Sequence, residues 1–564
     1  MIHRFPPTDP MRIRVSTSLL AATLLLVSCS SDKSAGTGGG TVLVSMLGDP
    51  GSLFPLSITD ETGRAVTDVL FDHLAEIGDG MSTLGDGGFQ PRLAKSWDWA
   101  PDSMSIVFHI DPAARFHDGV PVRASDVRYS LKLINDPALA TPAAPLVTNI
   151  DSISTPDSVT AKVWFKRHLP EEFYDVAYQI PIVPQHVYGK VAPADMKTSD
   201  VLRHPVGTGR FRFVRWDAGS RIEVIADTAN YRGRAKLDRV IFVTDQTPPA
   251  ATTAVLTGES DYFAAFPIDQ VSRLDSSSNV RGLPYVQLAY GYLGFRMRDR
   301  KSKTRPHPIL SEMAVRRAIS MSLDRAGMLA NIFNGKGFPA HGPFPAGAAT
   351  ADSTIRLPPY DTAAATALLD SAAWKLGSGG IRQKNGRPLK FEIMVPATSP
   401  IRQRFADLIQ EQLKRVGIEA ELGRVPTPTF LARVDAGDFD ALLDLRQTDP
   451  SVNGTKQYWS TEGEMAGTDF LAYANPRVDA LLDSAGRAPD LASVRRFATR
   501  AYQAIADDAP AVWLYNSSTV AAVNRRIVTQ PFRADGWWAH LADWSVPADK
   551  RIDRDRIGLQ PKTP

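Results

Sequence analysis

Cysteine is nearly absent from this chain, with one residue in 564, so no intramolecular disulfide can form. The chain also has no marked excess of basic charge, because it contains 64 Lys and Arg and 61 Asp and Glu residues. The composition therefore does not indicate a nucleic-acid partner. The ten histidines are scattered, without an HExxH motif or a zinc-spaced cluster. No Walker A, G-x-G-x-x-G or G-x-S-x-G motif occurs either. These absences predict a protein without metal, cofactor or catalysis.

The beginning of the chain has the features of a secretory signal peptide. Arg12 and Arg14 form a basic region, and residues 19–27 follow as a nine-residue run that is apolar except for one threonine. A serine then precedes Cys29. The run is shorter than the roughly 20 apolar residues that span a bilayer. We therefore interpret residues 1–28 as a signal peptide, which predicts a location outside the cytoplasm.

The residues around the single cysteine resemble the lipobox of bacterial lipoproteins. Residues 26–29 read Leu-Val-Ser-Cys, and the resemblance implies that Cys29 becomes the lipidated first residue of a membrane-anchored protein. Residues 29–40 are rich in serine and glycine and would form a flexible tether. The sequence leaves open which membrane holds the anchor, and whether Met1 or Met11 is the true start.

The remaining chain of about 536 residues is too long for one hydrophobic core, so we expect at least two lobes. Up to about residue 300 the pattern predicts mainly short strands. Beyond that point helices alternate with strands, which is typical of βαβ units and a mixed or parallel sheet. Two separate strands are expected at Val512–Tyr515 and Val520–Val523, and a helix at Ser125–Ile134 with Ser125 as its N-cap.

Several short segments, each a weak signal alone, occur in a characteristic order over about 400 residues. They are Leu-Ala-Lys-Ser-Trp at 93–97, Phe-His-Asp-Gly at 116–119, Pro-Val-Gly-Thr-Gly at 205–209, Val-Arg-Arg-Ala-Ile at 315–319 and Asn-Pro at 475–476. Together they resemble the extracytoplasmic solute-binding proteins of bacterial ABC importers, family 5, the peptide/nickel-binding family. The segments are turn and capping devices, so they indicate the scaffold and say little about the ligand.

The resemblance implies an α/β fold of the periplasmic-binding-protein type (class II, cluster C), with two lobes of mixed sheets flanked by helices. A hinged cleft between the lobes would enclose the ligand. Lobe 1 is expected at residues 41–295, with an extra subdomain at about 76–200. Lobe 2 is expected at 296–514, and residues 515–564 would return to lobe 1. We expect the protein to be a monomer.

One position departs from the peptide-binding members of this family. In those members, an aspartate lies three residues before an Asp-Pro pair and binds the α-amine of the peptide. The resemblance implies that the corresponding residue of this chain lies at the cleft. Here the pair is Asp449-Pro450, and that count leads to Arg446. The reversed charge predicts an anionic or strongly hydrogen-bond-accepting group of the ligand near Arg446, whose planar guanidinium suits a carboxylate or phosphate. The alternative is a scaffold ion pair of Arg446 with Asp444 or Asp449.

Aromatic residues are the other binding candidates that the resemblance implies. Tyr290, Tyr292, Tyr458 and Trp459 lie where the family lines its cleft. Such rings can stack on a ligand and offer a hydrogen bond at the same time. The alternative for each of them is packing in the core.

We interpret the chain as a lipoprotein that captures an oligopeptide or a similar small polar solute and delivers it to the permease subunits of an ABC transporter. This predicts peptide transport across the cell membrane from the periplasm or the outer cell surface, without catalysis by the chain itself. Two alternatives stay open. One is a lipid-anchored sensor or chaperone-like binder on the same fold, and the other is an unrecognised extracytoplasmic hydrolase.

Overall fold

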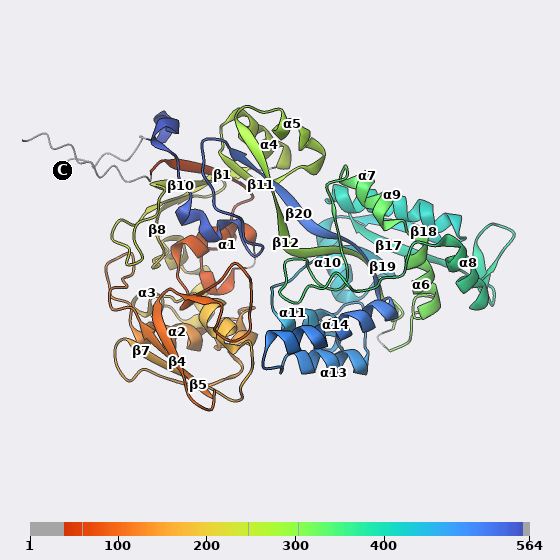
Figure 1. Cartoon of the computed structure of the whole chain (residues 1–564), viewed down its shortest axis with the longest axis horizontal. Coiled ribbons are helices and arrows are strands. Elements are labelled where there is room, and N and C mark those ends of the chain that lie inside the picture. Colours follow the sequence, from red (N-terminus) through yellow and green to blue (C-terminus); the bar gives the residue numbers. More distant parts are fainter. Residues whose placement is uncertain (1–38, 59, 246, 303, 556–564) are drawn as a thin grey trace, which may run out of the picture.

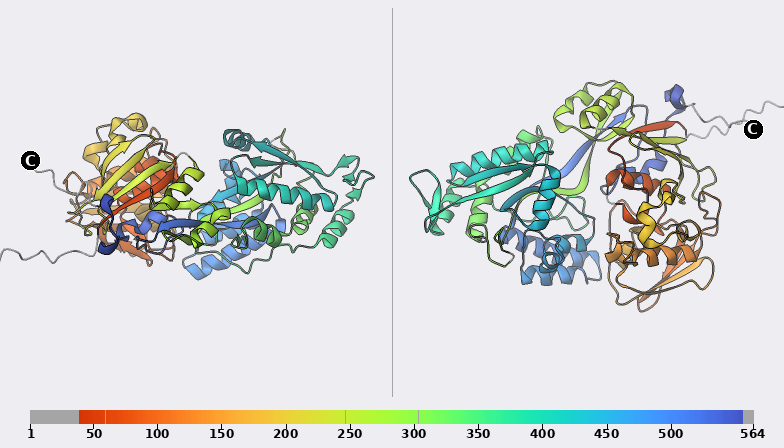
Figure 2. Two further views of the ribbon diagram at one scale, coloured as in Figure 1. Left: turned by 90° about the horizontal axis from the view of Figure 1, so that it is seen from above. Right: turned by 180° about the vertical axis from the view of Figure 1, so that it is seen from behind.

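The structure is a computed structural model that describes residues 39–58, 60–245, 247–302 and 304–555. Two lobes lie side by side (Figure 1). The first half of the chain and the dark blue C-terminal segment form the left lobe, named lobe 1 here, and the green to blue region forms the right lobe, named lobe 2. The views from above and from behind show the same two bodies (Figure 2).

One mixed sheet of eleven strands extends through both lobes of the described chain. In spatial order its main path is β18 (Glu419–Val425), β17 (Lys390–Pro396), β19 (Ala441–Gln447), β12 (Val280–Phe295), β20 (Ala511–Asn524), β11 (Tyr262–Phe266), β1 (Thr41–Leu47), β10 (Arg239–Asp245), β9 (Arg221–Ala226) and β8 (Phe211–Asp217), with β13 (Phe338–Pro339) paired to β20. Strands β12 and β20 run from one lobe into the other (Figure 1). They pair antiparallel from Val280 opposite Asn524 to Gly294 opposite Ala511.

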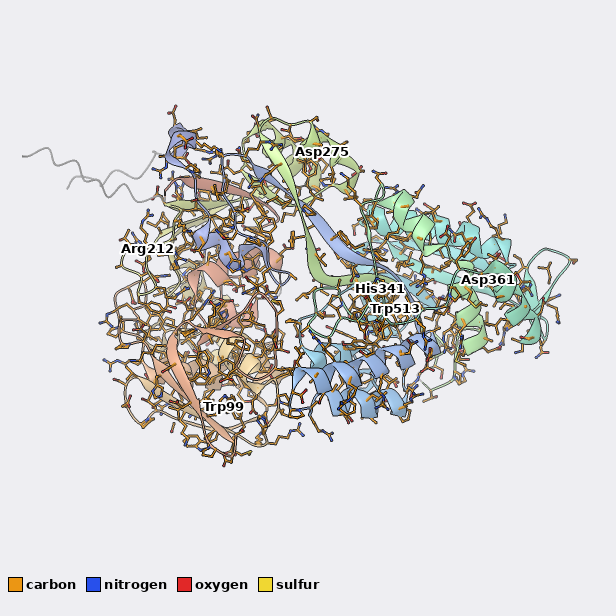
Figure 3. All side chains as sticks on the ribbon, viewed as in Figure 1. Trp99, Arg212, Asp275, His341, Asp361 and Trp513 are labelled. Carbon is orange, nitrogen blue, oxygen red and sulfur yellow. The ribbon has the colours of Figure 1, made fainter. Side chains whose placement is uncertain are left out.

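Smaller sheets complete the strands. Lobe 1 holds a four-stranded sheet of β4 (Ala94–Trp99), β5 (Ser105–Ile110), β7 (Thr160–Phe165) and β6 (Ile150–Ser154), next to the pair β2 (Ala75–Ile77) and β3 (Phe89–Pro91). Lobe 2 carries the hairpin strands β14 (Lys375–Leu376), β15 (Arg382–Lys384) and β16 (Arg387–Pro388). Trp99, labelled in Figure 3, marks the four-stranded sheet at the far end of lobe 1.

Helices cover the sheets in both lobes. In and above lobe 1 they are α1 (Glu61–Leu70), α2 (Ala124–Ile134), α3 (Gln185–Tyr188), α4 (Pro248–Thr257) and α5 (Ser272–Asp275). In lobe 2 they are α6 (Met313–Ser322), α7 (Arg325–Ile332), α8 (Thr362–Ser371), α9 (Pro400–Arg415), α10 (Thr427–Ala436), α11 (Val452–Tyr458), α12 (Thr461–Ala466), α13 (Pro476–Ala485) and α14 (Leu491–Asp508). The mixed α/β architecture expected from the sequence is therefore confirmed.

Three local expectations from the sequence are wrong. The separate strands Val512–Tyr515 and Val520–Val523 are one continuous strand, β20, whose polar middle lies where the chain crosses between the lobes. Ser125 does not cap α2, because Arg123 is the N-cap residue and the Asp126 carboxylate accepts its backbone N–H at 2.8 Å. Gly39 and Gly40, which the sequence placed in the flexible tether, are buried and hydrogen-bonded to lobe 1, and the rest of the expected tether lies outside the described residues.

The glycines of the Pro-Val-Gly-Thr-Gly segment allow a close approach of backbone to α1. A Cβ on Gly207 would lie 1.9 Å from the carbonyl oxygen of Leu70, and one on Gly209 would lie 2.2 Å from that of Val69. The Gly209 N–H donates to the Leu70 carbonyl at 2.8 Å. No larger residue fits this contact, which fixes the C-terminal end of α1 and the residues that follow it.

A buried ionic network joins the two ends of lobe 1. Asp261 is fully buried and accepts hydrogen bonds from the Arg526 guanidinium at 2.9 and 2.8 Å and from the Leu43 N–H at 3.0 Å. Arg526 also donates to Asp555 at 2.8 Å, and Asp555 accepts the Thr41 N–H at 2.8 Å. The first strand and the last described residues are thus held by the same charges.

Candidate functional site

A cavity of about 1380 Å³ lies between the two lobes. Lobe 1 contributes α1, the residues after it, the segment around residues 169–181 and the C-terminal residues 533–543. Lobe 2 contributes residues 447–458 at the end of β19 and the start of α11, and the crossing strand β12 contributes residues 285–288. The cavity therefore has walls from both lobes and from the hinge strand, which is the arrangement that encloses a ligand on lobe closure.

Carboxylates gather at one part of the cavity wall. Asp449 follows β19 in lobe 2, and Glu171 and Asp175 come from lobe 1. The pKa of Asp449 is raised to about 6, because the surrounding protein displaces water and Glu171 repels its charge. Burial and the same repulsion from Glu171 and Asp449 raise the pKa of Asp175 well above its usual value. This wall is electrostatically prepared for a positively charged group, which would relieve the repulsion.

A single π-helical turn, η3 (Tyr174–Tyr178), supplies part of the same wall. Tyr174, Asp175 and Tyr178 all line the cavity from this turn. Turns of this type are rare and occur frequently at functional sites. Arginines occupy another part of the lobe 1 wall, with Arg64 and Arg92 among them. The cavity thus presents groups of both charge signs, as a zwitterionic or polar solute requires.

The lobes also touch each other directly in this structure. The Ser451 hydroxyl of lobe 2 donates to Glu171 at 2.7 Å, and the Thr83 hydroxyl of lobe 1 donates to the other oxygen of Glu171 at 2.6 Å. Next to Thr83, the Leu84 side chain packs against an apolar cluster of α13 and α14 that contains Ala485 and Val494. The lobes are therefore joined by a polar contact at Glu171 and by an apolar contact of Leu84, which lies in the loop between β2 and β3.

A family model for bacterial extracellular solute-binding proteins, family 5 (middle region), matches residues 88–465. This chain belongs to that family. The match covers more than half of the sequence and includes the crossing strand β12, the end of β19 and most of the cavity wall.

Individual relatives agree with this assignment. The chain is 24% identical over 517 residues to the oligopeptide-binding protein AppA of Bacillus subtilis strain 168, which covers 88% of this chain and 92% of the relative. The structure of the same Bacillus subtilis protein in complex with a nonapeptide superposes with a TM-score of 0.75 at 22% identity, covering 90% and 99% of the two chains. NikZ from Campylobacter jejuni in complex with Ni(L-His) gives a TM-score of 0.75 at 20% identity, covering 90% and 99%. These structures establish the two-lobe fold, and their different ligands leave the solute open.

Family membership makes this chain an extracytoplasmic solute-binding protein and not an enzyme. Within the described ranges, no helix combines the length and apolar character that a membrane crossing needs. The same residues contain no group of three or more His, Cys, Asp or Glu side chains placed to hold a metal ion.

Two of the residues expected from the sequence lie at the cavity of this solute-binding protein. Asp449 and Tyr458 both line it, from the segment that links β19 to α11. The Asp449 carboxylate accepts the N–H of Ser451 at 2.9 Å, which fixes the tight turn before α11. Their contact with a solute stays a prediction.

Arg446 lies inside lobe 2 and is not among the described residues that line the cavity. Its guanidinium carbon is 4.1 Å from the ring centre of Tyr458 and 4.4 Å from that of Phe470. Its Nη2 donates to the Tyr292 hydroxyl at 3.0 Å. Arg446 is therefore held by cation–π contacts. They take the place of the ion pair with Asp444 or Asp449 that the sequence offered as the alternative. This placement favours a structural role over contact with an anionic ligand.

The remaining candidates form the core around Arg446. Tyr290 and Tyr292 are fully buried, and Trp459 is 1% exposed and donates to the Tyr290 hydroxyl at 2.8 Å. Asp444 accepts the Tyr292 hydroxyl at 3.2 Å and pairs with an arginine of α9 at 3.3 Å. Alternation along β12 turns both tyrosines to one face, toward the cluster that contains Trp513, which Figure 3 labels inside lobe 2. None of these four residues is among the described lining residues of the cavity.

Sequence reasoning missed the residues that give the cavity its charge. Glu171, Asp175, Arg64 and Arg92 lie far apart in the chain and belong to no motif. The adjacent pair Glu171-Glu172 is visible in the sequence, but only the fold shows that both side chains are almost fully buried. Folding of lobe 1 and its contact with lobe 2 bring these residues together.

Replacing Leu84 with aspartate is expected to open the lobes. The change removes an apolar contact with α13 and α14 worth about 1 kcal/mol, which shifts an open–closed equilibrium about fivefold toward the open form. Small-angle scattering of the ligand-free protein would show a larger radius of gyration. Leu431→Asp, at a 55% exposed position on α10, is the matched control. An unchanged radius for Leu84→Asp would contradict the role of this contact.

Proposed function

We propose that this protein captures an oligopeptide or a similar small polar solute between its lobes and delivers it to the permease of an ABC transporter. The observation that supports this most is the interlobe cavity of about 1380 Å³, whose wall carries carboxylates and arginines from both sides of the cleft. A short peptide has charged ends of opposite sign and a polar backbone between them. A short peptide can therefore interact with both the carboxylates and the arginines that line the cavity.

Closure of the lobes strengthens these contacts. Polar interactions gain energy when water is excluded from the site, and groups such as Asp449, whose pKa is already raised by burial, gain most from an opposite charge. A solute that contacts both lobes favours the closed form, because it binds that form better. The permease would then distinguish loaded from empty protein by its shape.

Native mass spectrometry of protein purified without denaturation tests this proposal. The expected result is a retained mass that fragments as a peptide or another polar solute, and that disappears when the lobes are opened by mild denaturant. A retained apolar lipid, or chemical turnover of the solute by pure protein, would contradict the proposal. Uptake of the same solute, compared in cells with and without the ABC permease proposed as the partner, would distinguish import from sensing.

We also propose that the protein is anchored to a membrane through lipidated Cys29, which lies outside the described residues. The residues between Cys29 and Gly39, the first described residue, are rich in serine and glycine, and we propose that they act as a tether that lets the lobes reorient at the surface. Lipid chains contribute about 0.8 kcal/mol per buried CH₂, and two or more chains hold a protein stably.

Cys29→Ala is expected to release the protein from membranes, because an alanine cannot be acylated. Fractionation of cells that express each form checks this, with Ser30→Ala as a control that keeps the anchor. A Cys29→Ala protein that stays entirely in the membrane fraction would contradict the lipid anchor.

A further inference from the structure

Glu171 of lobe 1 binds a hydroxyl from each lobe. One of its carboxylate oxygens accepts the hydroxyl of Ser451 in lobe 2 at 2.7 Å, and the other accepts the hydroxyl of Thr83 in lobe 1 at 2.6 Å. The backbone N–H of the same Ser451 donates to Asp449 at 2.9 Å. Two carboxylates from opposite lobes, Glu171 and Asp449, are therefore hydrogen-bonded to one residue at the lobe contact.

A third carboxylate, Asp175 on η3, adds to the negative charge at this contact. Burial and repulsion from Glu171 and Asp449 raise the pKa of Asp175 well above its usual value. Asp449 keeps an exposed surface inside the cavity, yet the enclosing walls and the charge of Glu171 raise its pKa to about 6. Because Asp449 belongs to lobe 2 and the other two carboxylates to lobe 1, their mutual repulsion grows as the lobes approach.

The other titratable groups that act on Asp449 do not cancel this repulsion. Arg64 of α1 lowers the pKa of Asp449, but burial and Glu171 outweigh its effect. Burial and the charge of Asp449 raise the pKa of the Tyr174 phenol on η3 well above its usual value, so this group stays neutral. Within the described ranges Asp449 has no ion pair. Its charge is therefore only partly compensated when the lobes touch.

We propose that a proton on Asp449 favours closure of the lobes without any solute, because Glu171 and Asp175 then no longer face a negative charge across the contact. The hydrogen bond from the Ser451 hydroxyl to Glu171 does not need ionised Asp449 and stabilises the closed form. This inference rests on the lobe closure that the proposed function uses, and it adds a regulation of that closure by pH.

The direction of the effect follows from proton binding. The pKa of Asp449 is about 6 when the lobes touch, and it returns toward the ordinary aspartate value of 3.8 when they separate. The closed form therefore binds more protons than the open form, and closure becomes more favourable as the pH falls through about 6. Above that pH both forms carry the charge, so the closed fraction stays constant. Asp175 shifts in the same direction and broadens the transition.

Fluorescence energy transfer between one dye on each lobe measures closure directly. Ser96→Cys on β4 and Ala432→Cys on α10 place the dyes at exposed positions outside the cavity. A Cys29→Ala background leaves no other cysteine to label. Between pH 7.5 and pH 5, without solute, we expect the ratio of closed to open protein to rise about fivefold, since cavity water screens part of the repulsion.

Asp449→Asn is the decisive variant, because asparagine has the shape of the protonated carboxyl and cannot ionise. At pH 7.5 it should be closed about as often as the natural protein is at pH 5, and it should lose most of the pH response. Asp435→Asn, at an exposed position on α10 outside the cavity, should follow the natural protein. A pH response of equal size in Asp449→Asn would overturn the inference, since another group would then titrate.

Ser451→Ala separates the hydrogen bond from the repulsion. This variant keeps all three carboxylates, so it should be closed less often at every pH and still respond to pH about fivefold. Energy transfer in the natural protein that does not change with pH, but does change when the solute binds, would overturn the inference and leave the proposed function intact. A transfer that neither pH nor solute changes would overturn both.

Discussion

Replacing Asp261 with asparagine is expected to lower the free energy of unfolding of lobe 1 by about 3–5 kcal/mol. The carboxylate is fully buried and accepts from two guanidinium groups, those of Arg526 and Arg554, as well as from the Leu43 N–H. Asparagine keeps the shape but removes the negative charge, and it turns one acceptor into a donor that faces Arg526. Arg526 would then keep only the carboxylate of Asp555 among its ion pairs in the described chain, and Arg554 would lose its ion pair with Asp261.

Thermal unfolding followed by circular dichroism measures this effect, with Asp217→Asn as the matched control. Asp217 is 45% exposed and pairs with Arg221 at 3.1 Å on the β8–β9 hairpin, where an exposed ion pair contributes less than about 1 kcal/mol. Equal shifts for the two variants would show that the buried network adds no stability beyond that of a surface pair.

Replacing Asp449 with asparagine is expected to weaken solute binding about a hundredfold, which corresponds to about 2.7 kcal/mol. The carboxylate lines the cavity at the end of β19, and its pKa of about 6 shows that the empty site already disfavours its charge. A cationic group of the solute would remove that penalty and form a charge-assisted hydrogen bond. Asparagine can offer only a neutral oxygen.

The same residue predicts the pH dependence of binding. A cationic ligand stabilises ionised Asp449, so binding competes with its protonation. Above the pKa of about 6 in the empty protein the affinity should be constant, and below it the affinity should fall by up to tenfold per pH unit. Asp175, whose pKa is raised well above the usual value by burial and by Glu171, is coupled to it and would broaden the transition.

Titration calorimetry across pH, with the solute found by native mass spectrometry, measures both effects. Asp435→Asn, an exposed position on α10 outside the cavity, is the control and should match the natural protein. Asp449→Asn should bind weakly at every pH and lose most of the dependence below pH 6. A variant that retains full affinity would remove Asp449 from the binding site.

Much of the fold was predictable because its signals are local. The turn glycines at 207 and 209, the Phe-His-Asp-Gly segment and the alternating helices and strands beyond residue 300 indicated the family and the two-lobe architecture without coordinates. The crossing strands were harder to recognise. Strand β20 contains a polar stretch at 516–519 that resembles a break, yet the strand continues through it and pairs with β12 on both sides of a register shift between Val286 and Tyr290.

The candidate site was predictable only in part. The position of the Asp-Pro pair indicated the segment of lobe 2 that reaches the cavity, and Asp449 and Tyr458 lie there. The residues next to Arg446 in the sequence did not predict that its side chain points into lobe 2. The rings of Tyr458 and Phe470 that hold it come from other parts of the chain. Periodicity gives the face of a strand but not the contents of the core behind it.

The sequence by itself determined what kind of protein this is. Order and spacing of short turn and capping segments are properties of the chain, and they identify a two-lobe solute-binding protein, while the lipidation of Cys29 stays a prediction. Tertiary structure alone decided which charges face the solute. Glu171 and Asp449 meet across the lobes, because electrostatic interactions depend on distances that only the folded chain fixes.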